Sequence, residues 1–245
     1  MKRILFACLA AMMLLVPGVA NAQHTKSAKY YSQAASRLQN EVVALKKEIL
    51  EYYPQIGSIN NINAKTVAHA SEVLSCGNMM EMKESVYIEI AYSKIRIKNF
   101  YINQLKAVKS ANQRQVLVDD HDECAKEVSN MGDVMGVLSS LENFGGSMAG
   151  LEYSAAELKV YEAWYSALSK GNKTRVSQKE ATNLIRKMRA VWKKEYQNMR
   201  AQLSGSDFRD GLKNYDNDMK KYIGNLEGMF AKKTPYRWLT NTFKF

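Results

Sequence analysis

Apolar residues in this chain recur at alternating steps of four and three residues, and this spacing constrains the fold more than any other feature. It places apolar side chains on one side of an α-helix, whereas a half-buried strand requires strict alternation. The spacing runs through four segments, which are 31–52, 117–138, 181–203 and 208–229. Pro or Gly residues follow each segment and are typical helix terminators. We therefore predict an all-α fold, a bundle of about five long helices with coiled-coil-like seams plus one short helix.

Capping signals delimit the helices further. Residues 154–157 and 177–180 both have the Ser-x-x-Glu form, in which the serine and glutamate side chains each bond a free amide at the helix start. A short helix is expected from Asn63, its cap, to about Ser75. Gly171 stands where the helix carrying apolar residues from 158 to 168 should end in a left-handed residue.

The segment 86–102 fits two kinds of secondary structure. Val86, Ile88 and Ile90 alternate as in a strand, and isoleucine favours strands. However, no Gly, Pro or Asn-Gly turn divides the run, and its apolar residues also form a helical stripe. We therefore predict one long helix from Glu81 to about Ser110.

Residues 1–22 have the three parts of a cleavable secretory signal. A short basic start precedes an apolar run from Ile4 to Val16, and small residues stand at Ala20 and Ala22. The alternative is a retained membrane anchor, but the run is shorter than the roughly 20 apolar residues that a span requires. We expect cleavage between Ala22 and Gln23, and hence an exported protein that is periplasmic, extracellular or at the cell surface.

Composition shifts divide the rest of the chain. We expect an N-terminal helical half over 23–144, a flexible Gly-rich linker over 145–153, and a C-terminal helical half over 154–233. An apolar and aromatic tail, residues 234–245, begins at the Thr-Pro pair that ends the last helix.

Two cysteines follow the predicted signal, Cys76 and Cys124. An even number of cysteines in an exported chain predicts a disulfide between them, and two free thiols are the alternative. A second alternative joins the same cysteines with His69 and His121 as four zinc ligands, although the tight CxxC spacing of specific zinc sites is absent. The acidic run 119–123 suggests a cation site, but consecutive carboxylates on a helix point in different directions, so we interpret it as a solvated face.

No established catalytic motif occurs in the sequence. The chain lacks GxSxG, HExxH and a Gly-rich phosphate loop. We therefore predict no catalytic residue and no cofactor. A pair of carboxylates brought together by folding would escape this search.

Basic residues exceed acidic ones, and the whole chain has a formal net charge of +11. Such an excess favours acidic partners, and contact with an anionic membrane or with cell-wall polymer remains open. Basic side chains gather in three segments, 170–175, 186–194 and 231–238. Aromatic residues among them can stack on nucleic acid, but at helical spacing they more often pack in a core, so we do not expect nucleic acid as a partner.

The C-terminal tail contains four candidate partner-binding residues, Trp238, Leu239, Phe243 and Phe245. Two alternatives remain open for it. The tail either folds back on the bundle or docks on another protein as an added strand.

Long seams and few reactive residues favour a non-enzymatic interaction protein, an adaptor or accessory component of an envelope assembly such as a secretion or conjugation apparatus. In architecture alone the chain resembles the helical minor-pilin components of conjugative secretion systems, and it shares no diagnostic motif with them. This implies other envelope or secretion-system proteins as partners, and the seams also allow a homo-oligomer. The alternatives are a periplasmic carrier for an acidic or lipidic ligand between helices, and a cell-wall enzyme with an unrecognised carboxylate pair.

Overall fold

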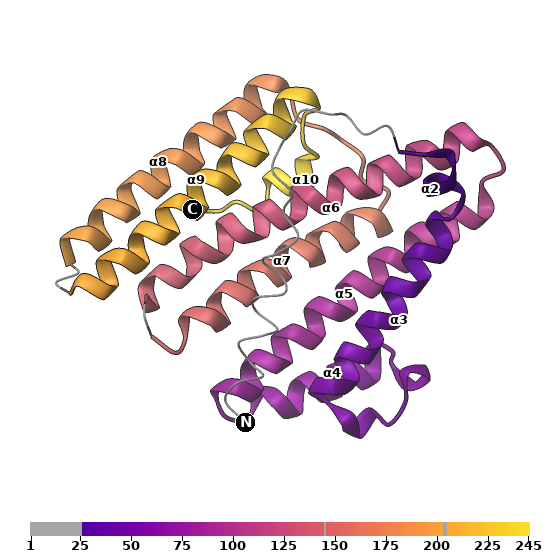
Figure 1. The fold of residues 1–245 in the computed structure, drawn as a ribbon, viewed down its shortest axis with the longest axis horizontal. Coiled ribbons are helices and arrows are strands. Elements are labelled where there is room, and N and C mark those ends of the chain that lie inside the picture. The colour runs from indigo at the N-terminus through magenta and orange to yellow at the C-terminus, as the bar shows by residue number, and fades with distance from the viewer. Residues whose placement is uncertain (1–25, 145, 203–204) are drawn as a thin grey trace.

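The computed structural model describes residues 26–144, 146–202 and 205–245, and this part of the chain is helical with no strand (Figure 1). The predicted all-α fold is confirmed. The helices are α2 (Ala28–Ser32), α3 (Ala34–Tyr52), α4 (Ala64–Ser75), α5 (Met79–Ala107), α6 (Ala111–Ser140), α7 (Ala149–Ser169), α8 (Gln178–Gln202), α9 (Ser206–Lys232) and α10 (Arg237–Thr240). Short 3-10 turns lie at Pro54–Ile56, Ile59–Asn61 and Leu141–Asn143.

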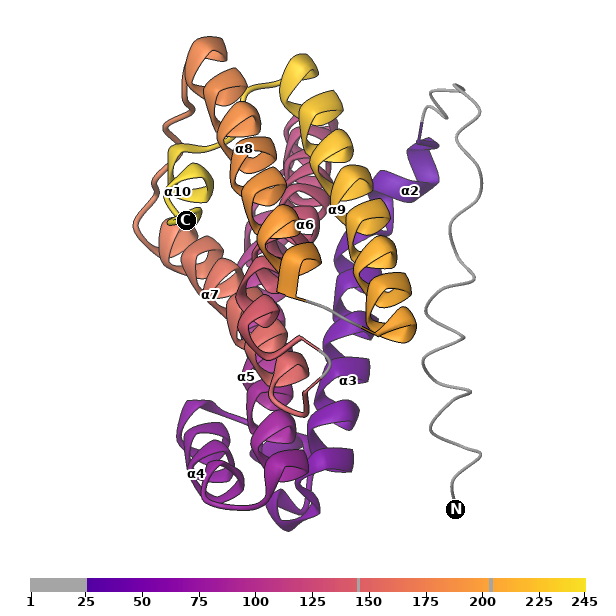
Figure 2. The ribbon, with the colours of Figure 1, turned by 90° about the vertical axis from the view of Figure 1, so that its left-hand side faces the viewer.

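The long helices lie side by side in the spatial order α3, α5, α7, α6, α9, α8 (Figure 1). The short helix α4 packs against α5. At the two faces of this array, α2 rests on α6 and α10 rests on α7, and Figure 2 shows these two small helices on opposite sides of the molecule. None of the helices in the described ranges has both the length and the apolar character that crossing a membrane requires. The predicted signal and its cleavage site at Ala22 and Gln23 lie outside the described residues.

The ambiguous segment 86–102 is part of one helix, α5, as predicted. Its strand-like alternation arises because Ile88 and Ile90 are both buried, although they point to different sides of the helix. Helices α3, α4, α6 and α7 all pack against α5, so nearly every side of it faces protein. A helix surrounded in this way does not need a single apolar stripe.

Helices α6 and α7 approach each other closely at two glycines of α6. A Cβ atom added at Gly136 would lie 2.6 Å from the ring of Tyr153, and one added at Gly132 would lie 3.1 Å from Glu157 Cγ. The glycines therefore allow α7 to pack directly on the α6 backbone. Around this contact lies the centre of the core, which includes Val128, Met131, Val134, Val160 and Trp164.

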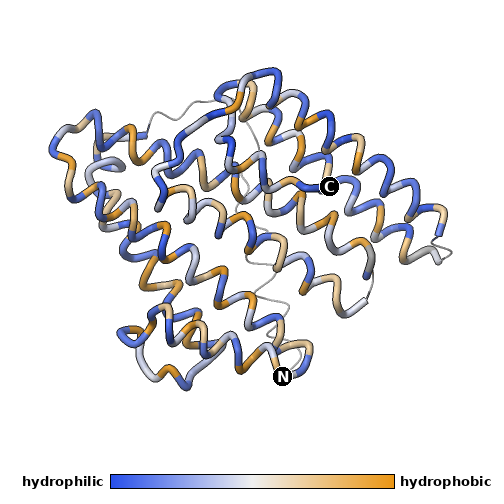
Figure 3. The backbone as a smooth tube through the Cα atoms, turned by 180° about the vertical axis from the view of Figure 1, so that it is seen from behind, coloured by the Kyte–Doolittle hydropathy of each residue, from blue (hydrophilic) through white to orange (hydrophobic). Residues whose placement is uncertain are grey.

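Helices α8 and α9 pair along their predicted apolar stripes. Met188 and Trp192 of α8 are buried, as are Met219 and Leu226 of α9. The Trp192 indole Nε1–H donates to Asp216 Oδ1 at 2.9 Å, so its polar edge is also satisfied. Figure 3 shows hydrophobic and hydrophilic residues alternating along the long helices, as expected for amphipathic rods.

The capping predictions had mixed outcomes. Asn63 caps α4, the Ser177–Glu180 pair forms the predicted reciprocal hydrogen bonds, and Gly171 has a left-handed φ of 63°. The predicted cap at Ser154 is wrong, because α7 already begins at Ala149 and the Ser154 hydroxyl donates to the Gly150 carbonyl within the helix. The expected linker over 145–153 is therefore helical from residue 149 onward.

Candidate interaction site at the C-terminal tail

The tail, residues 234–245, folds back on the bundle through backbone hydrogen bonds. Val176 N–H donates to the Pro235 carbonyl at 3.0 Å, and Arg237 N–H donates to the Thr174 carbonyl at 2.8 Å. These bonds flank an antiparallel bridge between Arg175 and Tyr236. The tail thus folds back on the bundle, as one of the two alternatives proposed, and its backbone pairs with a loop of the same chain.

Three of the four candidate partner-binding residues are buried by this fold. Leu239 is 0 %, Phe243 5 % and Trp238 9 % exposed, whereas Phe245 is 41 % exposed. The Lys187 ammonium of α8 also lies over the Phe243 ring, 5.4 Å from its centroid. Trp238, Leu239 and Phe243 therefore complete the core beside α7, in agreement with the alternative in which the tail folds back.

Asp120 of α6 binds the tail through a hydrogen bond from Tyr236. Its carboxylate accepts hydrogen bonds from the Tyr236 hydroxyl at 2.5 Å and from the Tyr101 hydroxyl of α5 at 2.9 Å. Burial, reinforced by the Asp120 charge, raises the pKa of both phenols. The Arg175 guanidinium lies over the Tyr236 ring at 3.9 Å from its centroid, and one of its nitrogens is 3.9 Å from Asp120 Oδ1. Charge and cation–π attraction thus fix Tyr236 from two sides.

A small cavity of about 50 Å³ lies beneath the tail. Its lining includes Asp120, Cys124, Trp164, Tyr236 and Trp238. The buried Trp164 indole Nε1–H has no hydrogen-bond partner among the described residues. A water molecule needs roughly 10–15 Å³ of such space, so the cavity has room for a few waters and is too small for an organic ligand.

On the outer side of Trp238 lies a larger, open groove of about 530 Å³, which we call the tail groove. Its apolar lining comes from α6, α7 and the tail, and consists of Met135, Ala163, Ala167 and Trp238. Three lysines also line it, Lys159, Lys170 and Lys244, and all three are exposed. Within the described residues no carboxylate lines the groove, and none of the three lysines takes part in an ion pair.

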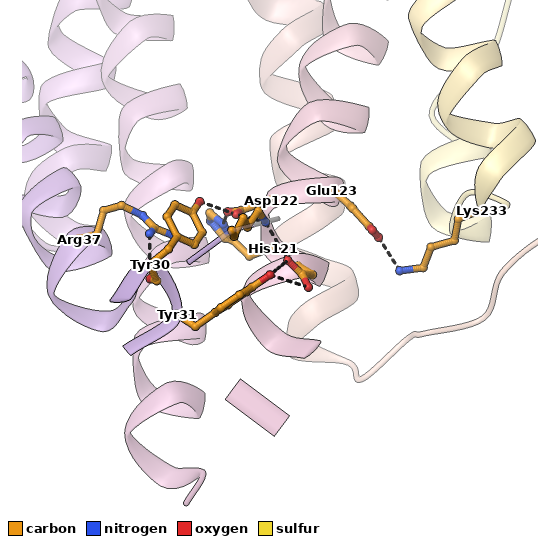
Figure 4. A network of polar contacts seen from close by, with 9 residues as sticks. Tyr30, Tyr31, Arg37, His121, Asp122, Glu123 and Lys233 are labelled. Carbon is orange, nitrogen blue, oxygen red and sulfur yellow. Dashed lines mark hydrogen bonds and ion pairs between the residues drawn. The ribbon is translucent and has the colours of Figure 1, made fainter. Parts of the chain in front are cut away.

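The acidic run 119–123 makes specific contacts on both sides of α6, as Figure 4 shows. Asp122 accepts from Lys26 at 2.7 Å and from the Tyr30 hydroxyl at 2.7 Å, and so ties α2 to the bundle. Despite its burial, the pKa of Asp122 is lowered by hydrogen bonds from His121, Lys26 and Tyr30. On the other side, Glu123 pairs with Lys233 at 2.5 Å. The carboxylates point in different directions, as expected. Glu123 lies on an exposed face beside the buried His121 and Cys124, whereas Asp122 is largely buried, so the run is solvated only in part.

The structure does not form the predicted disulfide. Cys76 is an exposed free thiol at the end of α4, whereas Cys124 is a free thiol buried in α6. Burial raises the pKa of the Cys124 thiol. Helix α4 packs on α5 at the edge of the bundle, so its end does not reach the interior position of Cys124.

The four-ligand zinc alternative is also not assembled. His69 is exposed on α4, whereas His121 is buried, 4.9 Å from the ring centroid of Tyr101, and its Nδ1 is 3.0 Å from Asp122 Oδ1. Among the described residues, no three His, Cys, Asp or Glu side chains are placed to hold a metal ion together.

Glu127 is a buried carboxyl that no pattern in the sequence singles out. It is 3 % exposed on α6, and its Oε2 has no hydrogen-bond partner among the described residues. Burial raises the pKa of Glu127 to about 7, while Arg175 and Lys233 counteract this effect. Glu127 lines neither the small cavity nor the tail groove, so its position does not suit a catalytic acid acting there.

We compared the chain with protein-family models, curated proteins and solved structures. No protein-family model, no curated protein and no solved structure matches the chain.

Proposed function

We propose that this chain is an exported, non-enzymatic interaction protein that serves as an adaptor or accessory component of an envelope assembly. The observation that carries the proposal is the tail groove, an open hollow of about 530 Å³ with apolar and basic linings. Protein interfaces combine an apolar centre with a polar rim, and the groove offers both on a rigid support of helices. Its basic rim agrees with the basic excess of the chain, which remains after Lys2 and Arg3 leave with the predicted signal and which favours acidic partners.

A site-specific cross-linker tests the proposal in the organism that makes the protein. A photoreactive amino acid replaces Lys170 at the groove, and in a second variant it replaces Lys65, an exposed residue of α4. We expect illumination to join the Lys170 variant to one envelope protein in good yield, and the Lys65 variant to none or to a different set. If neither variant yields a discrete cross-linked partner, the adaptor proposal fails.

Export is a separate part of the proposal and has its own measurement. The predicted signal leads us to expect that the protein recovered from the envelope fraction begins at Gln23. N-terminal sequencing of that material reads the cleavage site directly. A protein that keeps Met1 and stays in the cytoplasmic fraction contradicts export.

A second candidate function, a carrier for an acidic ligand, draws on the same three lysines of the tail groove. Mass spectrometry of the protein under native conditions separates the two functions. A small anion bound at one copy per chain favours the carrier, whereas a ligand-free mass together with a cross-linked protein favours the adaptor.

A further inference from the structure

We propose that the tail groove binds a short amphipathic segment of a partner protein, whose apolar side chains enter the groove and whose carboxylates meet the lysine rim. This inference rests on the proposed adaptor function and specifies the chemistry of the partner. It follows from how the groove is lined, how its charges are spaced and how its wall is held in place.

The lining comes largely from one side of α7. Lys159, Ala163, Ser166 and Lys170 are spaced by four, three and four residues, so they lie along a single stripe of the helix. Trp238 of the tail also lines the groove, with the 9 % of its surface that remains exposed. The apolar side chains of the groove are bordered by polar ones, which include Ser166, Asn172, Asn241 and Thr242. A groove of this mixed character suits one side of an amphipathic helix, which has an apolar stripe with polar flanks.

The spacing of the lysines selects the kind of anion. Lys159 of α7 and Lys170, the residue that caps the C-terminal end of α7, are eleven positions apart, which corresponds to about 16 Å along the helix axis. A single phosphate or carboxylate cannot bridge that distance. A segment of about three helical turns with carboxylates near both ends does match it, and Lys244 extends the rim onto the tail.

The shape of the site distinguishes a peptide from a lipid surface. A planar anionic membrane contacts the protruding parts of a protein, whereas the apolar lining here lies in a hollow. The charges on the rim are exposed and unpaired within the described residues, so a docking segment does not first have to break an ion pair. A peptide can place side chains inside the hollow, and a flat bilayer cannot.

Contacts within the chain hold Trp238, the tail residue that lines the groove, without any partner. Tyr236 stacks on Trp238 at an interplanar angle of 17°, and Tyr236 is itself fixed by Asp120 and Arg175. Arg237, the residue between them, pairs with Glu180 of α8 at 3.0 Å. The groove is therefore already formed in the free protein, which lowers the entropic cost of binding.

The test uses the purified protein and a synthetic helical peptide of about 14 residues, with Leu at helical spacing and Glu on the flanks. Tryptophan fluorescence reports binding, because Trp238 lines the groove. We expect saturation at one peptide per chain and weaker binding as salt increases. A scrambled peptide of equal charge, without the apolar stripe, should bind about tenfold more weakly or worse, because it leaves the apolar lining uncovered.

Two charge-reversed variants distinguish binding at the groove from attraction of the peptide to the overall positive charge of the protein. The triple variant Lys159→Glu, Lys170→Glu and Lys244→Glu should weaken peptide binding about tenfold or more, because it replaces three attractive charge pairs with repulsion. The matched variant changes the same number of exposed lysines on α8, Lys179, Lys193 and Lys194, and should weaken it about twofold or less. Circular dichroism and the thermal midpoint verify that both variants fold.

Defined outcomes overturn the inference. Equal weakening by both triple variants indicates attraction to the overall charge, and failure of the peptide to bind at all excludes an amphipathic segment. Groove-dependent binding to vesicles of phosphatidylglycerol, without peptide binding, assigns the surface to a membrane instead. In each of these cases a partner cross-linked at position 170 still preserves the adaptor proposal, whereas absence of any cross-linked partner removes the adaptor proposal itself.

Discussion

The Tyr236 hydroxyl donates a 2.5 Å hydrogen bond to Asp120 Oδ1 and thereby joins the C-terminal tail to the middle of α6. Tyr101 shares the same carboxylate from α5. Three segments that are distant in the sequence thus meet at one side chain, and this junction positions the wall of the tail groove.

Replacing Tyr236 with Phe removes one hydrogen bond to a charged acceptor that is about one quarter exposed. We expect the free energy of unfolding to fall by about 1–2 kcal/mol, measured by urea denaturation. Protease cleavage within the tail should also become faster. The control is Tyr165→Phe, because the Tyr165 hydroxyl donates no hydrogen bond among the described residues, and its effect should stay below about 0.5 kcal/mol. Equal effects of both variants contradict a special role for the Asp120 junction.

Glu127 should make stability depend on pH near neutrality. Its pKa is about 7 in the folded chain and about 4.5 when exposed, so the folded state binds more protons between these values. Stability is therefore highest below about pH 4.5 with respect to this group, and it declines as pH rises toward and through 7. The full effect is on the order of 3 kcal/mol, from 1.36 kcal/mol per pKa unit.

The variant Glu127→Gln removes this titration. We expect its urea midpoint to change much less than that of the wild type between pH 5 and pH 8, and to exceed the wild-type midpoint at pH 8. The exposed substitution Glu162→Gln on α7 serves as the control and should retain the wild-type profile. A Glu127→Gln profile parallel to that of the wild type shows that this carboxyl is not the titrating group.

The two cysteines should differ sharply in reactivity. Cys76 is exposed, whereas Cys124 is buried and the pKa of its thiol is raised, so far less thiolate forms there. We expect a maleimide to modify Cys76 alone in the folded protein and both residues in urea, as read by peptide mass spectrometry. Recovery of a Cys76–Cys124 linked peptide from protein that was never reduced contradicts the structure.

Two glycines, one in the close contact of α6 and α7 and one beside open space on α9, should respond in opposite ways to substitution by alanine. Gly136→Ala places a Cβ against the Tyr153 ring and should destabilise the fold by about 1–3 kcal/mol. Gly228→Ala on α9 meets open space and should stabilise it by about 0.4–1 kcal/mol, because alanine restricts the unfolded chain. Thermal unfolding measures both. Similar midpoints for the two variants contradict the close packing at Gly136.

The periodic spacing of apolar residues predicted the helices well because each amphipathic helix must bury one stripe. It worked for α8 and α9, where Met188 and Met219 lie on the predicted stripes and are fully buried. It was ambiguous for α5, because Ile88 and Ile90 are both buried in a helix that neighbours surround. Periodicity describes one exposed side and one buried side, and α5 does not have that contrast.

The site was less predictable because its parts come from distant segments. Consecutive acids on α6 gave no sign that Asp120 faces Tyr236 while Asp122 faces Tyr30, since partner choice depends on tertiary packing. The tail was recognised as apolar, and folding back was one alternative, but nothing local showed which surface would bury Trp238. The expected disulfide rested on compartment and on an even count, neither of which specifies the distance between two Cα atoms.

Leu239, which has no exposed surface, belongs to a tail that packs on α7. Proteolytic loss of this tail therefore uncovers apolar side chains of α7. Such newly exposed apolar surface favours self-association, so cleavage in the tail converts a well-packed bundle into a protein prone to aggregation.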